Sequence, residues 1–138
     1  MSYKNAEGYA DPTAGAAIAS VTREEKAKTY KPLVYVCSPF SGDIEANTEN
    51  AKRYCRFAVD SNAIPLAPHL HYPSFMHEDD PAEREMGLFF GIVLLGKCDE
   101  LWAFGETVSV GMKAEIDKAK RKNMVVRYFT TECEEVQK

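Results

Sequence analysis

A glutamate near the start of a predicted helix is the residue of this sequence best placed to do chemistry. Glu115 follows closely on a loop that contains Ser109 and Gly111. On a helix, its side chain lies about 60° from Met112, at the edge of an apolar stripe that includes Ile116. The carboxylate can therefore face a cleft. The alternative is a solvated glutamate paired with the lysine three residues later.

The loop before this helix is a candidate anion site. The first N–H groups of a helix have no partner within it and carry the positive end of its dipole. Ser109 and Gly111 can offer a hydroxyl and a closely approaching backbone to a phosphate or ribose oxygen. Gly105, Glu106 and Met112 are further candidate substrate contacts in the same region. A serine that only caps the helix is the alternative.

A second loop carries residue types that suit a nucleoside ligand. Ser38, Phe40, Ser41 and Gly42 follow directly on an apolar run. Phe40 could stack on a base, and the serine and glycine residues could bind sugar or phosphate oxygens. An ordinary tight turn explains the same composition.

Three histidines, His69, His71 and His77, fall within nine positions and precede the acidic residues 78–80. On an extended segment His69 and His71 point the same way, so with a carboxylate they could hold a divalent metal ion. The segment lacks the helical frame of an HExxH site, and we expect no metal. We expect instead that His69 faces a substrate, and a purely structural loop is the alternative. A lid is predicted from the residues that follow: Tyr72, Phe75 and Met76.

The elements that must position these residues alternate along the chain. Strands are predicted over 33–37, 63–67, 99–104 and 124–129, and helices over 45–62, 81–97 and 111–122. Alternation implies parallel pairing with right-handed crossovers, hence a three-layer α/β sandwich. Its mainly parallel, Rossmann-like or flavodoxin-like sheet has four to five strands. Ligands of such sheets bind beyond the carboxyl ends of the strands, where the candidate loops lie.

The chain divides into three predicted segments. Residues 1–31 form an N-terminal arm that includes a helix over 13–28, residues 32–130 form the domain, and residues 131–138 form an acidic, frayed tail. The helix over 82–97 is apolar around nearly its whole circumference, which a small domain cannot bury alone. We therefore expect a homodimer or a higher homo-oligomer through this helix.

Bulk composition excludes several classes of protein. The net charge of −4 and the pI near 5.4 argue against nucleic acid polymers as partners, which require clustered basic residues. The sequence has neither a membrane span nor a signal-peptide pattern, so we expect no membrane partner and a cytoplasmic protein. The four cysteines show no CxxC spacing and are predicted to be reduced and structural.

Several of these motifs together resemble the signature of the nucleoside 2-deoxyribosyltransferase superfamily. They are residues 99–105 (DELWAFG), 109–112 (SVGM) and the pair Glu115-Ile116, with 35–42 (YVCSPFSG) similar to the first strand and turn. The resemblance spans about residues 33–129. In combination with Pro68-His69-Leu70, these motifs look most like a branch often associated with phages. The spacing of Ser109, Gly111 and Glu115 is also similar to that of deoxynucleoside 5′-monophosphate N-glycosidases.

The resemblance implies hydrolysis or transfer of the N-glycosidic bond of a (deoxy)nucleoside or its monophosphate. Glu115 would attack the anomeric carbon through an oxocarbenium-like transition state, and water or a second base would resolve the glycosyl-enzyme without a cofactor. Ser109 and Gly111 would contact a 5′-phosphate. Candidate donors to the departing base are Asp99, Glu106 and His69, and Asp99 could equally cap the start of its strand. Where those hydrolases have a Gly/Arg-rich phosphate loop, this chain has Pro39 and Asp43.

Two other functions stay open at the level of sequence. A non-catalytic nucleotide-binding or sensing module would retain the pocket without turnover. A metal-dependent hydrolase would instead use the loop that contains His69, His71 and His77. In the first case, as for the enzyme, the partner is a small-molecule nucleoside or nucleotide.

Overall fold

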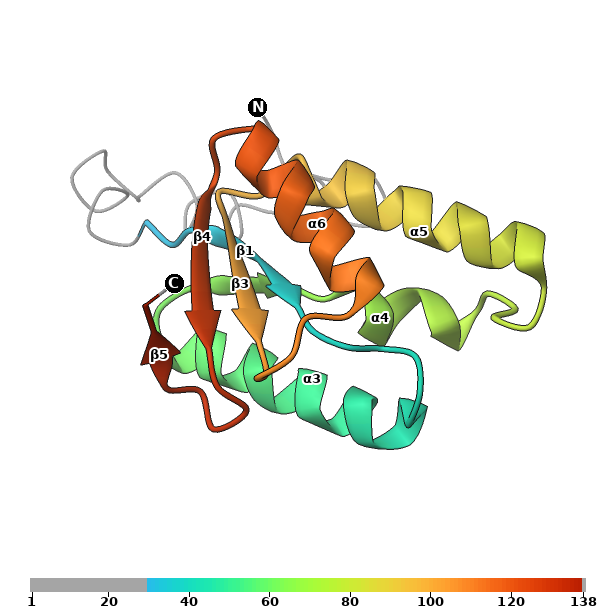
Figure 1. Ribbon diagram of the computed structural model, residues 1–138, viewed down its shortest axis with the longest axis horizontal. Helices are drawn as coiled ribbons and strands as arrows, with labels where there is room; N and C mark the ends of the chain where they lie inside the picture. The colour runs from blue at the N-terminus through green and yellow to red at the C-terminus, as the bar shows by residue number, and fades with distance from the viewer. Residues whose placement is uncertain (1–29, 138) are drawn as a thin grey trace, which may run out of the picture. The chain divides into compact units, whose positions relative to one another are not determined.

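The computed structural model describes residues 30–137, and these fold around a five-stranded sheet (Figure 1). The strand order is β2-β1-β3-β4-β5, with parallel pairing from β1 to β4 and an antiparallel β5. The strands are β1 (Leu33–Cys37), β2 (Ile64–Leu66), β3 (Glu100–Phe104), β4 (Val125–Phe129) and β5 (Glu135–Val136). The mainly parallel sheet confirms the predicted fold class. The predicted N-terminal arm and its helix lie outside the described residues.

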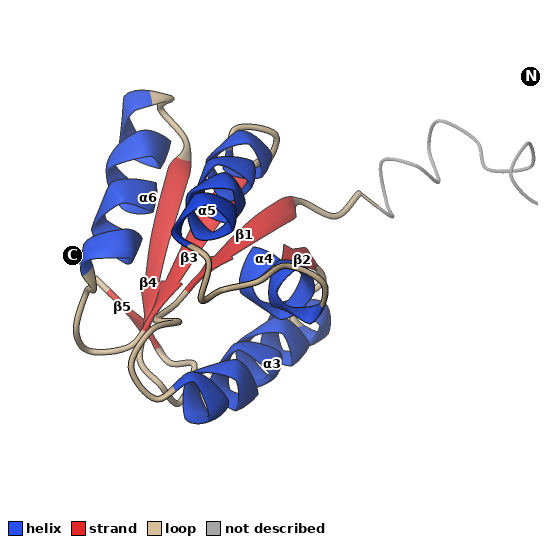
Figure 2. Cartoon of the chain, turned by 90° about the vertical axis from the view of Figure 1, so that its right-hand side faces the viewer, coloured by secondary structure: helices blue, strands red, loops and turns tan. Residues whose placement is uncertain are grey.

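Helices cover both faces of this sheet. They are α3 (Ile44–Asp60), α4 (Pro68–His71), α5 (Pro81–Leu95) and α6 (Val110–Arg121), with a 3-10 turn at Tyr72–Ser74. Figure 2 shows α3 on one side of the sheet and α5 and α6 on the other. The three-layer arrangement is therefore confirmed. Between residues 30 and 137, no helix is long and apolar enough to cross a membrane.

Strand β1, which pairs with β2 on one edge and with β3 on the other, contributes to both halves of the core. Val34 and Val36 join a cluster on the α3 side, whereas Tyr35 and Cys37 join a cluster with Met112 on the α6 side. Alternate side chains of a strand point to opposite faces, so a strand covered on both faces is apolar at every position. This explains the continuous run over 33–37. It also places Tyr35 and Cys37 on the face that α6 covers.

Three polar side chains start the long helices. Asp43, Asp80 and Ser109 each accept a hydrogen bond from a first-turn backbone N–H, at 3.1, 2.9 and 3.2 Å respectively. Such a cap contributes about 1 kcal/mol to helix stability. Because the caps set where the helices begin, α3, α5 and α6 start within one residue of their predicted positions.

The segment after β2 is helical rather than extended. Helix α4 begins with Pro68 in its first turn and passes directly into the 3-10 turn, whose last residue, Ser74, donates to the His71 carbonyl at 2.6 Å. Proline is well suited to a first helical turn because its missing N–H has no partner there. The expectation of an extended loop at His69 and His71 was therefore wrong, because both residues belong to helix α4.

The acidic tail is also ordered where it was predicted to fray. Residues 135 and 136 pair with β4, and both guanidinium nitrogens that face Glu135 donate to its carboxylate at 2.8 Å. The donor, Arg127, also lies over the Trp102 ring, 4.7 Å from its centroid. An Arg–carboxylate pair with two parallel hydrogen bonds is the strongest geometry of its class. It ties the tail to the sheet edge.

Helix α5 keeps much of its apolar surface exposed. Within it only Gly91 and Leu95 are buried, whereas Met86, Leu88, Phe89 and Val93 are exposed, Phe89 by 64%. In Figure 1 the amino-terminal half of α5 projects beyond the sheet. An apolar surface of this kind marks an interaction site more often than a solvated face. We therefore continue to propose a homo-oligomer that forms through this surface of α5.

We predict that Phe89→Glu weakens self-association of the chain. A charge in an apolar helix contact has to be desolvated without a partner, which raises the dissociation constant of a dimer by at least about tenfold. Sedimentation equilibrium of both proteins measures this change. Lys120→Glu, at an exposed position of α6, is the control and should not alter association. A wild-type chain that is monomeric at every concentration would contradict the prediction.

Candidate active site

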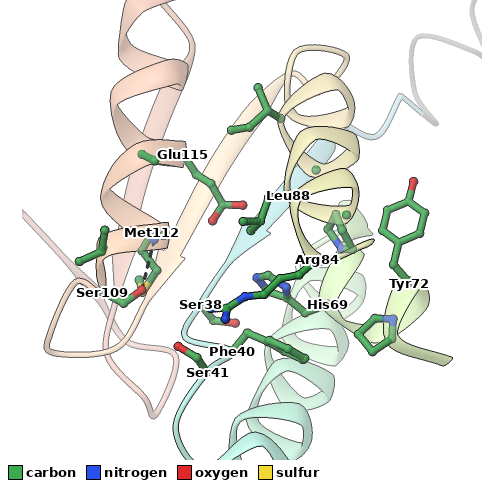
Figure 3. A pocket seen from close by; sticks show the side chains of 18 of the residues that line it. Ser38, Phe40, Ser41, His69, Tyr72, Arg84, Leu88, Ser109, Met112 and Glu115 are labelled. Atoms are coloured by element: carbon green, nitrogen blue, oxygen red, sulfur yellow. Dashed lines mark hydrogen bonds between the residues drawn. The ribbon is translucent and has the colours of Figure 1, made fainter. Parts of the chain in front are cut away.

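A cavity of about 540 Å³ opens beyond the carboxyl end of β1, between α5 and α6 (Figure 3). Its size is that of a small-molecule site. Its walls come from four separate parts of the chain. These are the end of β1 with the residues that follow it, helix α4 with its 3-10 turn, residues 84–92 of α5, and the start of α6. Of the candidate site residues, the cavity brings together Ser38, Phe40, Ser41, His69, Ser109, Gly111, Met112 and Glu115.

Glu115 lies at the inner wall of this cavity and is only 9% exposed. The Tyr35 hydroxyl donates a hydrogen bond to its Oε2 atom, and the Cys37 thiol lies 3.5 Å from its Oε1 atom. Burial raises the pKa of Glu115 above its ordinary value, while the hydrogen bonds from Tyr35 and Cys37 act in the opposite direction. The carboxylate is thus buried from water but accepts hydrogen bonds from two side chains.

Both donors stay protonated. Burial, together with the negative charge of Glu115, raises the pKa of Tyr35 well above the usual range of a phenol. The same two causes raise the pKa of the Cys37 thiol. Neither group therefore competes with Glu115 for the negative charge at neutral pH. The arrangement keeps one carboxylate oriented by two neutral donors on β1.

A glycine of α5 makes room for the tyrosine hydroxyl. A Cβ atom at Gly91 would lie 3.2 Å from Tyr35 Oη, closer than most such contacts in proteins. At Gly87, one turn earlier, a Cβ atom would meet only the Met76 side chain at 4.0 Å. The close approach of α5 to β1 therefore depends on Gly91 and not on Gly87.

The start of α6 combines a helix cap with an open backbone. The Ser109 hydroxyl accepts from the Met112 N–H, so the capping alternative holds for this serine, yet Ser109 also lines the cavity. At Gly111 a Cβ atom would meet nothing within 4 Å. The backbone here is accessible to a ligand, and the helix dipole favours a negative one.

The loop after β1 presents a buried hydroxyl to the cavity. Ser38 is 3% exposed, and its Oγ atom has no hydrogen-bond partner among the described residues. The loop is held by Asn47, whose side-chain amide donates to the carbonyls of Phe40 and Ser41 at 3.1 and 2.9 Å. A buried polar group without a partner is uncommon in native proteins and points to a missing partner such as a ligand.

His69 faces the cavity from α4. Its ring stacks on Phe40 with a centroid distance of 4.8 Å and an interplanar angle of 19°. Burial lowers the pKa of His69, so the imidazole is neutral at neutral pH. The stacked pair forms one wall of the cavity. The other face of the Phe40 ring is not used by His69, so the predicted stacking of Phe40 on a base stays a prediction.

Four candidate residues do not line this cavity. The Asp99 carboxylate accepts from the Leu33 N–H at 2.7 Å, at the amino ends of β1 and β3 and thus at the opposite end of the sheet. Gly105 and Glu106 line a smaller cavity of about 130 Å³, where Glu106 accepts weakly from Thr131. Gly42 lies in a turn with a positive φ of 96°.

The histidine segment has no metal-binding geometry in the described part of the chain. No group of three or more histidine, cysteine or acidic side chains could hold an ion there. Because α4 is helical, residues two positions apart point away from each other, and His71 turns toward Phe75, 5.0 Å between ring centroids. Of the predicted lid, Tyr72 lines the cavity, whereas Phe75 is 59% exposed.

Sequence reasoning missed three functional candidates: Tyr35, Cys37 and Arg84. The first two were interpreted as part of an apolar strand. A tyrosine in a strand buried on both faces requires a hydrogen-bond partner, and a residue two positions along shares its face, so a signal was present. Arg84 lines the cavity and is the one basic residue between 81 and 96. That isolation was its signal.

Comparison with known proteins gives a family and a fold. The profile of a domain of unknown function, DUF7768, matches residues 32–129. No curated protein matches the sequence. Among solved structures, the chain is similar to a 2-deoxyribosyltransferase from the psychrotolerant bacterium Bacillus psychrosaccharolyticus, with 15% identity and a TM-score of 0.55. The similarity covers 70% of this chain and 71% of that chain. At this identity, it shows a shared fold.

We predict that alanine substitutions at the two glycines of α5 have different effects. Gly87→Ala should raise the free energy of unfolding by about 0.5–1 kcal/mol, because alanine favours the helix. The free energy of unfolding of Gly91→Ala should be lower than that of Gly87→Ala by about 1 kcal/mol or more, because the new Cβ atom crowds the Tyr35 hydroxyl. Urea denaturation measures both. Equal changes in the free energy of unfolding for the two variants would show that a methyl group at residue 91 does not strain the packing of α5 against Tyr35.

The pKa of Glu115 predicts a pH dependence of stability. Because its folded pKa exceeds the ordinary value of 4.5, its contribution to the free energy of unfolding is fully present below that pH and is lost as pH rises through the folded pKa. Glu115→Gln cannot ionise. The stability of this variant relative to wild type should therefore increase with pH across that interval.

Urea denaturation of both proteins at several pH values measures the difference. Subtraction of the two curves removes the other titrating groups, which both proteins share. A difference that does not change with pH, or that changes in favour of the wild type, would contradict the raised pKa of Glu115.

Proposed function

Because the chain belongs to the DUF7768 family and shares its fold with a 2-deoxyribosyltransferase, we propose that it cleaves or transfers the N-glycosidic bond of a nucleoside or nucleoside monophosphate. Glu115 is the proposed nucleophile. The observation that carries the proposal is a single buried carboxylate that faces a ligand-sized cavity and receives hydrogen bonds from Tyr35 and Cys37. Such an oriented carboxylate suits attack on a sugar carbon.

In the first step, an oxygen of ionised Glu115 forms a bond to C1′ as the bond from C1′ to the base nitrogen breaks. The electron pair of the broken bond leaves with the base, through an oxocarbenium-like transition state. Tyr35 holds Oε2, whereas Oε1 receives only a weak thiol hydrogen bond, so Oε1 is the proposed attacking atom.

The departing base needs a hydrogen-bond donor and a proton. Of the three candidates from the sequence, His69 lines the cavity, whereas Asp99 and Glu106 lie elsewhere. Burial lowers the pKa of His69, so its neutral ring donates an N–H hydrogen bond rather than a full proton. The base then takes its proton from solvent. His69 is therefore proposed to orient the leaving base.

In the second step, the glycosyl-enzyme ester is broken. A water molecule attacks C1′ and loses a proton to solvent, or the nitrogen of a second base attacks it, and Glu115 departs as the carboxylate. Two displacements at the same carbon retain its configuration. Hydrolysis yields the free sugar, and transfer yields a new nucleoside, so product analysis distinguishes the two.

A nucleotide-binding module without turnover is the second candidate. The observation that favours it is the position of Asp99 and Glu106 outside the cavity, which leaves the departing base without a nearby carboxylic acid from these two residues. Tight binding of a nucleotide without release of base would favour this function over catalysis.

We predict that Glu115→Gln abolishes base release, with kcat lowered by at least about 1,000-fold, since the amide is not nucleophilic. Tyr35→Phe should lower kcat by about tenfold or more through loss of carboxylate orientation. The assay incubates each protein with ribo- and deoxyribonucleosides and their 5′-monophosphates, with and without a second free base. Chromatography quantifies free base and new nucleoside.

The matched control is Asp117→Asn, which removes an exposed carboxylate of the same helix outside the cavity. Its activity should equal that of wild type. The nucleophile assignment fails if no substrate releases base, or if Glu115→Gln releases base as fast as Asp117→Asn does.

A further inference from the structure

Arg84, an exposed residue that lines the cavity, has no counter-ion among the described residues. Arg84 lines it from the first turns of α5, and Figure 3 shows the side chain extending from the helix into the cavity. Within residues 30–137, no carboxylate forms an ion pair or a hydrogen bond with its guanidinium group. The lining carboxylates, Glu78 and Glu115, are therefore not its partners. Among the described residues that line the cavity, Arg84 is the one arginine or lysine, although the chain has a net charge of −4.

Hydrogen-bond donors line the same cavity. The buried Ser38 hydroxyl has no hydrogen-bond partner in the described part of the chain, and Ser41 also lines the cavity. At the start of α6, the open backbone of Gly111 adds N–H groups at the positive end of a twelve-residue helix. Arginine, two hydroxyls and a helix start together match an anion with several oxygens. A carboxylate, with two oxygens, would use fewer of these donors.

The position of these donors relative to Glu115 indicates where the anion lies on a substrate. Ser109 precedes Glu115 by six residues, which is about 9 Å along the helix axis. With C1′ of a sugar at Glu115, an anion at the helix start lies across the sugar ring, on the side of C5′. A sugar with a 5′ ester bridges a separation of this order.

We propose that the cavity selects nucleoside 5′-monophosphates over nucleosides, and that Arg84 of α5 is the residue that determines this selectivity by pairing with the phosphate. The inference rests on the proposed function for the position of the sugar. The cationic contact then comes from helix α5. The loop after β1 cannot supply it through Pro39 and Asp43, which carry no positive charge. The planar guanidinium can donate two parallel hydrogen bonds to phosphate, which lysine cannot do.

The experiment compares Arg84→Gln and Arg84→Lys with wild type on matched deoxynucleosides and deoxynucleoside 5′-monophosphates. Wild type should favour the monophosphate in kcat/KM by about 100-fold, the effect of one or two charged hydrogen bonds. Arg84→Gln should lower kcat/KM for the monophosphate far more than for the nucleoside and so remove most of this preference. Arg84→Lys should retain part of it. Arg121→Gln, an exposed arginine outside the cavity, should leave the preference unchanged.

Binding separates this inference from the proposed function. Calorimetry with Glu115→Gln and the same monophosphates and nucleosides needs no turnover. Monophosphate binding that is lost on addition of Arg84→Gln supports the phosphate site even if no base is ever released. The inference is overturned if nucleosides and monophosphates bind equally, if neither binds, or if Arg84→Gln weakens the binding of both to the same extent. Base release without a preference for the monophosphate also overturns the inference, but it leaves the proposed function intact.

Discussion

A carboxylate that leaves water requires donors at fixed positions, and this constraint organises the centre of the molecule. Glu115 belongs to the inward face of α6, together with Met112 and Ile116. Its donors are two alternate residues of β1, and they reach it because α6 packs on the sheet face formed by β1, β3 and β4, toward which both side chains point. Burial of the charged form is costly unless such hydrogen bonds are present. The packing of α6 on β1 and the chemistry of the cavity therefore depend on the same contacts.

The parallel sheet decides what else can reach this point. Because β1 and β3 lie side by side and run in the same direction, the loops that follow them emerge together at their carboxyl ends. One loop brings Ser38 and Ser41, and the other brings Ser109 and the start of α6. Helix α5 then closes the remaining side, and Gly91 permits its approach to Tyr35. The cavity is therefore defined by Gly91, by the caps that start α5 and α6, and by the register of β1 and β3.

The sequence predicted the elements with long periodic patterns and failed where order depends on few residues. The helices α3, α5 and α6 have several turns each, so their apolar spacing and caps are visible. Helix α4 has four residues, fewer than a pattern requires, and β5 has two residues, held by Arg127 of the neighbouring strand β4. Neither of these leaves a local signal. Such elements are set by tertiary contacts.

For the site, sequence reasoning located the loops but not every side chain within them. Ser38, Ser109 and Glu115 were expected near a ligand from strand direction and helix angle, and the structure brings them to one cavity. Asp99 precedes its strand, and residues before a parallel strand lie at the amino end, away from the site. Arg84 was missed because its helix was interpreted as an oligomer contact alone.

The cavity is built from segments that are far apart in the chain. Residues 38–41, 68–73, 84–92 and 109–115 all contribute to its wall, so it cannot exist until three crossovers have formed. Long-range contacts of this kind appear late in folding, since loop closure precedes them. A small molecule bound there acts as a clasp between the first and last thirds of the domain. Amide hydrogens throughout the central strands would then exchange more slowly with solvent, even at positions that the molecule never touches.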